Sequence, residues 1–94
     1  MLNEIKKLQC LAVVSELNNR LNEIITELNI LKCSVKVGET SCIIAKRKGY
    51  KLTCKMCVIY QRIAKIIRST KDEIDYTGII INESDYCKII AFFG

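Results

Sequence analysis

Apolar residues recur along the first third of the chain with alternating gaps of four and three. The recurring positions are Cys10, Val14, Leu17, Leu21, Ile24, Leu28 and Leu31. No glycine or proline interrupts the run before Gly38. This spacing is typical of a heptad seam on one face of an α-helix. Asn3 is a suitable N-cap, and Glu4 follows in the first turn. The pattern predicts a long helix within residues 1–32.

The length of this helix bears on what covers its apolar seam. Thirty helical residues rise about 45 Å, whereas a compact chain of 94 residues is only about 30 Å across. The seam therefore predicts a second copy or another protein as its cover, and a bent helix lying on its own sheet is the alternative. The residues expected to form a homodimer are Val14, Leu17, Leu21, Ile24, Leu28 and Leu31.

Shorter patterns after residue 32 are typical of strands. Residues 33–37 alternate, and residues 41–45 and 50–54 flank a KRKG segment whose Gly49 suits a tight turn. An amphipathic helix is expected at about 55–70. A second hairpin is expected from the strand patterns at 74–81 and 86–93.

Together these elements predict an α+β fold in one domain, residues 1–94. It has a long N-terminal helix, a small antiparallel sheet of hairpins and a second amphipathic helix. Residues 1–32 are the expected dimerisation or docking segment, and residues 33–94 the expected α+β core. No apolar run reaches the length of a membrane span, and the charged first residues do not resemble a secretory leader. We therefore expect an intracellular protein, in the cytoplasm or nucleus of a host.

Charge is unevenly distributed along the sequence. Residues 33–71 contain ten basic residues and one acidic residue, so this segment has a net charge of +9 (10 − 1) within a chain of net +5. Basic clusters of this density are typical of phosphate-binding surfaces, on which an aromatic residue can stack on a base. The expected nucleic-acid-binding residues are Lys46, Arg47, Lys48, Tyr50, Lys51, Arg62, Lys65 and Arg68.

Four cysteines surround the expected first hairpin and are candidate ligands of a tetrahedral zinc ion. They are Cys33, Cys42, Cys54 and Cys57. The stretch GYKLTCKMCVIYQRIAKIIR, within residues 42–68, resembles the second half of treble-clef zinc fingers of the nuclear-receptor and TraR/DksA kind. The resemblance implies that Cys54 and Cys57 are zinc ligands and that the following helix reads a groove or a partner. Buried free thiols and a Cys42–Cys54 disulfide are the alternatives.

Enzyme chemistry is not indicated by the residue types present. The chain has no histidine to act as the base for a cysteine nucleophile, and no proline of the kind found beside thioredoxin-like CxxC motifs. We therefore expect a small, non-enzymatic nucleic-acid-binding protein, in the manner of a dimeric transcription regulator. The alternative is a viral or phage-type interaction module, an inhibitor or assembly adaptor that docks through its N-terminal helix.

Overall fold

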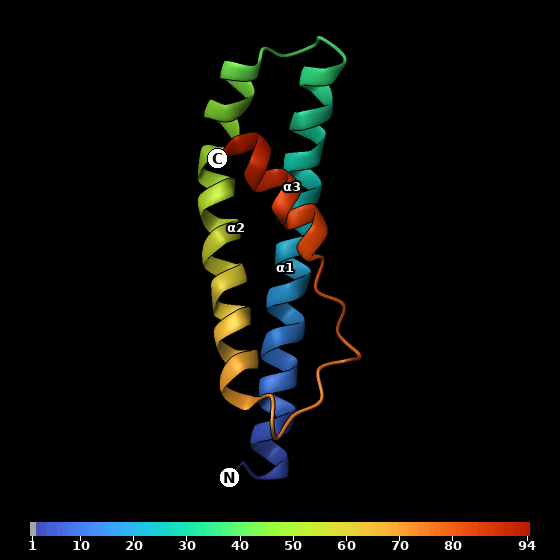
Figure 1. Cartoon of the computed structure of the whole chain (residues 1–94), viewed down its shortest axis with the longest axis vertical. Coiled ribbons are helices and arrows are strands. Elements are labelled where there is room, and N and C mark those ends of the chain that lie inside the picture. Colours follow the sequence, from blue (N-terminus) through green and yellow to red (C-terminus); the bar gives the residue numbers. More distant parts are fainter. Residues whose placement is uncertain (1) are drawn as a thin grey trace.

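Two long antiparallel helices form the body of the molecule, and a short third helix crosses one side of them (Figure 1). The computed structural model describes residues 2–94. Helix α1 spans Glu4–Lys36, α2 spans Cys42–Thr70 and α3 spans Glu83–Phe93. The fold is a rod of 52 × 19 × 17 Å. Its length is that of α1 itself, since 33 residues at 1.5 Å each rise about 50 Å.

The N-terminal helix is confirmed, with the cap that the sequence indicates. The side-chain oxygen of Asn3 accepts a hydrogen bond from the Lys6 N–H at 2.9 Å, which satisfies one free donor of the first turn. The helix continues to Lys36 and ends where Gly38 adopts a φ of +81°, a conformation that glycine reaches without steric cost. The chain then turns back within five residues, 37–41.

The α+β expectation is wrong, because the described residues 2–94 form helices and no strand. Residues 33–37 complete α1 and begin the turn. Ser41 does not begin a strand, because its hydroxyl accepts the Ile44 N–H at 3.2 Å and so caps α2. Both expected strands at 41–45 and 50–54 belong to that helix, of which the expected helix 55–70 is the second half.

The C-terminal hairpin expectation is also wrong. Residues 74–81 form an irregular connection, and residues 86–93 lie within α3. Asn82 begins this helix, since its side chain accepts the Asp85 N–H at 3.2 Å and donates to the Asp85 carboxylate at 2.6 Å. The connection is held down by the buried Ile74.

The core lies where the three helices meet. Helix α1 contributes Val14, Leu21, Ile25 and Leu28, α2 contributes Met56 and Ile63, and α3 contributes Ile89, all 3% exposed or less. Each such side chain contributes about 1.5–3 kcal/mol through removal of apolar surface from water. The two long helices are therefore packed against each other and against α3 by the chain's own side chains.

Candidate nucleic-acid interface

All eight basic residues in α2 are exposed, and the helix contains no acidic residue. Because Ala45, Met56 and Ile63 are buried against α1 and α3, the charged positions are confined to the remaining sides of the helix. At 100° per residue the basic residues cover an arc of roughly 200°. This arc divides into two sets that point in different directions.

The first set faces away from the rest of the molecule, and we call it the outer face of α2. It consists of Lys46, Arg47, Tyr50, Lys65 and Arg68. Tyr50 is 69% exposed and lies among these charges, as the stacking prediction requires. The distance along the helix from Lys46 to Arg68 is about 33 Å, close to one turn of B-form DNA.

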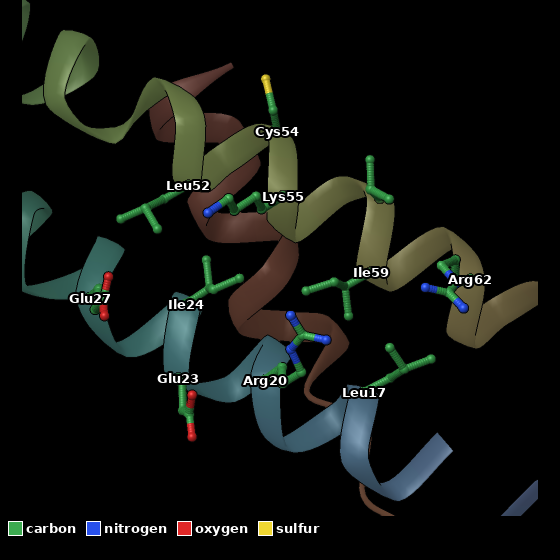
Figure 2. Close-up of a pocket in the computed structure, with 11 residues that line it drawn as sticks. Leu17, Arg20, Glu23, Ile24, Glu27, Leu52, Cys54, Lys55, Ile59 and Arg62 are labelled. Atoms are coloured by element: carbon green, nitrogen blue, oxygen red, sulfur yellow. The ribbon is translucent and has the colours of Figure 1, made fainter. Parts of the chain in front are cut away.

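The second set lies on the side of α2 nearer to α1, where Lys55 and Arg62 line a groove between the two long helices. We call it the groove side of α2, and it consists of Lys48, Lys51, Lys55 and Arg62. The groove measures about 560 Å³, and Arg20, Glu23 and Glu27 of α1 form its opposite wall (Figure 2). The predicted residue Arg62 therefore lies at the groove, whereas Arg47 and Lys65 lie on the outer face. Lys51 lies between the two sets, about 40° around the helix from Arg47.

The basic side chains of α2 are not engaged by the acidic residues of the same chain. Among residues 2–94 the one ion pair is Glu4 with Lys7, at 3.6 Å. Two acidic residues after α2 are engaged locally. The carboxylate of Asp75 accepts the Thr77 backbone N–H at 3.0 Å, which lowers the pKa of Asp75, and the carboxylate of Glu73 accepts the Leu2 N–H at 2.8 Å. The cations of α2 are left facing solvent.

The four cysteine thiols do not fit a zinc ion. Cys33 is on α1, and Cys42 and Cys54 lie on α2, about 18 Å apart along its axis. Cys54 and Cys57 are neighbours in the middle of α2, with no hairpin before them. No three histidine, cysteine or acidic side chains within residues 2–94 come together as metal ligands. The context that the zinc-finger resemblance implies is thus missing.

The residues expected to form a homodimer are mostly inside the single chain. Val14, Leu21 and Leu28 are fully buried, and Leu17 is 6% exposed. Ile24 and Leu31 are only partly buried. The burial of the other four positions by α2 and α3 removes the need for a second copy to cover them, so a homodimer stays a prediction in which only Ile24 and Leu31 of this set are open to a partner.

Sequence reasoning missed the groove and its charged residues Arg20, Glu23, Glu27 and Lys55 as a set. The signal was present in the apolar spacing of α2, where Ala45, Gly49, Leu52, Met56, Ile59 and Ile63 follow gaps of four and three. Together with the apolar seam of α1 and the short turn between the two helices, this second seam indicates an antiparallel pair of helices.

The fold and its charges define an α-helical hairpin with a crossing third helix and one strongly basic long helix. Comparisons with protein-family models, curated proteins and solved structures find no match for this chain. No helix in the described part of the chain is long and apolar enough to cross a membrane.

Proposed function

We propose that this protein binds nucleic acid through the outer face of α2. The observation that carries the proposal is the exposed outer face itself, four cations and one tyrosine on a helix that has no acidic residue. A cationic face about as long as one helical turn of a duplex can contact several phosphates at once, and the release of their counterions drives binding. Such contacts fix position on the backbone and do not read sequence.

The proposal includes the class and location of the protein. It is a non-enzymatic binding protein that works inside a cell, where duplex DNA and RNA are present. Tyr50 adds a ring that can stack on an unpaired base, so single-stranded segments are included among the ligands.

The test is the salt dependence of binding to duplex DNA and to duplex RNA, measured by fluorescence anisotropy. The triple variant Arg47→Ala/Lys65→Ala/Arg68→Ala is expected to reduce the slope of log affinity against log salt by about 3, one for each lost contact. The matched control is Lys6→Ala/Lys36→Ala/Lys88→Ala. It removes three equally exposed cations outside α2 and is expected to leave the slope unchanged. Equal losses in the two variants would contradict the proposal.

A second candidate is the interaction module that docks through α1. It is favoured by Ile5 and Leu8 near the start of α1, which are 69% and 65% exposed. Charged residues at Leu21 or Leu28 do not test this function, because both side chains are in the core and their replacement is expected to unfold the protein. The suitable variant is Ile5→Asp/Leu8→Asp, which changes α1 only where it is exposed.

A further inference from the structure

Helix α3 covers one side of the α1–α2 hairpin and leaves the other side open. Residues Asn18 and Ile25 of α1 face α3 and the connection before it, whereas Leu17 and Ile24 face the groove. The floor of the groove is apolar and only partly covered: Ile24 is half-buried and Val58 of α2 is 57% exposed. An apolar floor between two long helices is the surface on which further helices pack in a bundle.

The two walls of this groove differ in charge. The α1 wall carries the acidic residues Glu23 and Glu27 with a single cation, Arg20, and Glu16 lies one turn before Arg20 on the same helix. The charged residues of the α2 wall are both cations, Lys55 and Arg62, and Lys51 lies one turn before Lys55. Figure 2 shows Glu23 pointing away from α2, so its carboxylate is directed out of the hairpin rather than across the groove.

Acidic and basic residues on the two walls lie at matching heights. The turn between the antiparallel helices centres near residue 39, and the contact of Leu28 with Gly49 shows the resulting register. By this register, an acidic residue of α1 and a basic residue of α2 lie at the same height at three levels. The pairs are Glu27 with Lys51, Glu23 with Lys55 and Glu16 with Arg62. None of the three is within ion-pair distance in the single chain, where the described residues form only the Glu4–Lys7 pair.

A surface with one acidic wall and one basic wall is complementary to itself under a suitable twofold axis. An axis parallel to the rod places α1 of each copy on α2 of the other at the same height, so every acidic residue meets a cation of the partner. An axis across the rod instead places α2 on α2, basic on basic, which is repulsive. We propose that a second copy of this chain docks in the groove in the first arrangement, and that the protein is an antiparallel bundle of four long helices.

The proposed contact has the area and composition that a dimer requires. The broad side of the rod is 52 × 19 Å, which has room for the roughly 800 Å² that a standard interface takes from each partner. The contact covers Ile24, Val58 and the partly buried Leu52 in both copies. In this dimer Arg20 lies at the height of the partner's Val58, between the partner's Lys55 and the partner's Arg62. Glu16 and Glu23, one turn away from Arg20 on its own helix, reduce the repulsion between these cations.

A charge-swap experiment tests this arrangement, with the mass in solution measured by light scattering after gel filtration. The wild-type chain is expected at about twice its 10.7 kDa mass. Glu23→Lys/Glu27→Lys brings like charges together on both sides of the axis, and so does Lys51→Glu/Lys55→Glu. We expect each variant alone to dimerise at least about tenfold more weakly, and an equimolar mixture of the two to recover the dimer.

The mixture separates the dimer from effects within one chain. Two unlike charges that meet only inside a chain cannot be restored by mixing two faulty chains, so recovery in the mixture supports contact between copies. The matched control Glu4→Lys/Glu39→Lys makes the same change in net charge at exposed positions outside the groove, and it is expected to dimerise normally. A monomeric wild type, as for a groove that receives another protein, would overturn the proposal, and so would a mixture that stays monomeric.

The outcome is independent of nucleic-acid binding. The groove variants leave Lys46, Arg47, Lys65 and Arg68 unchanged, and the outer-face variant leaves both walls of the groove unchanged. A protein that dimerises without a salt-dependent affinity for duplexes supports this inference and contradicts the proposed function. A monomer that binds duplexes does the reverse.

Discussion

The ring of Tyr60 on α2 lies parallel to that of Tyr86 on α3, with centroids 4.0 Å apart and an interplanar angle of 6°. The stack helps to fix the short α3 to the long hairpin, together with the buried Ile89. Glu83 lies beside the Tyr60 hydroxyl and Cys57 beside the Tyr86 hydroxyl, so the polar ends of both rings meet groups of the neighbouring helix.

Two further contacts hold the C-terminal part of the chain to the hairpin: Phe93 packs close to Gly49, and Asn18 donates a hydrogen bond to the Ile80 carbonyl. The stability of the protein is expected to depend on all three contacts.

Loss of the stack is expected to destabilise the fold. Tyr86→Leu keeps an apolar side chain but removes the aromatic pair, and we expect the free energy of unfolding to fall by about 1 kcal/mol. Urea denaturation followed by circular dichroism measures this change. Tyr86→Phe keeps the stacked ring and is the control; a loss as large in that variant would assign the effect to the hydroxyl.

Stability is expected to fall in alkaline solution because of the same tyrosine. Burial raises the pKa of Tyr86 from 10.0 to about 12, and the Cys57 thiol adds to the shift. The folded state therefore favours the protonated phenol, and this contribution is complete below pH 10 and disappears as the pH rises toward 12. The free energy of unfolding of the wild type should decrease over that window more steeply than that of Tyr86→Phe, which has no group to titrate there. Parallel curves for the two proteins would contradict this account.

Gly49 is expected to be required by Phe93 of α3 rather than by a turn. A Cβ atom at this helical position would lie 2.8 Å from Phe93 Cε1 and 3.0 Å from Leu28 Cδ2. Alanine is favoured over glycine within a helix by about 1 kcal/mol, but both close contacts oppose this gain. We expect Gly49→Ala to be less destabilising in a Phe93→Ala background than in the wild type, because only the Leu28 methyl group then has to shift. A double-mutant cycle by thermal denaturation measures the coupling, and additive effects would exclude it.

Asn18 is expected to hold the connection before α3 in place and, at the same time, to lower the free energy of unfolding. Its side chain is 7% exposed and donates to the Ile80 carbonyl at 2.9 Å, while its own oxygen has no hydrogen-bond partner within residues 2–94. Asn18→Leu removes this unpaired acceptor and should raise the free energy of unfolding by about 1 kcal/mol. The freed connection at 77–81 should then be cleaved faster by protease. Replacement of the exposed neighbour, Asn19→Leu, should change neither property.

The sequence predicts α1 well and the rest poorly, for a physical reason. Asn3 and the uninterrupted heptad spacing determine α1 locally. In α2 the local pattern is misleading. Gly49 and its neighbouring cations are typical of a turn, yet Gly49 lies within a helix, close to the ring of Phe93, which follows forty-four residues later. The contact between Phe93 and Gly49 joins residues far apart in the sequence, so the local pattern around residue 49 does not predict it.

The same limit applies to the candidate site. The basic residues of the site are evident in the sequence, because residues 33–71 contain ten basic residues and one acidic residue. The sequence also predicts that these charged side chains are exposed. Their division between an outer face and a groove depends on where α3 packs. Because α3 covers the side of Asn18 and Ile25, the core shifts from Ile24 to Ile25 and the predicted seam residue Ile24 is left in the groove.

The end of the rod beyond Gly49 has no third layer, since α3 stops where Phe93 meets that glycine (Figure 1). Between residues 29 and 48 only Ala45 is buried, so this two-pronged tip opens at a lower free energy than the rest of the molecule. The tip also carries Lys46 and Arg47. These two cations therefore stand on a part of α2 that lies beyond α3, and they are expected to move more than the residues of α2 that pack against α3 near Tyr60.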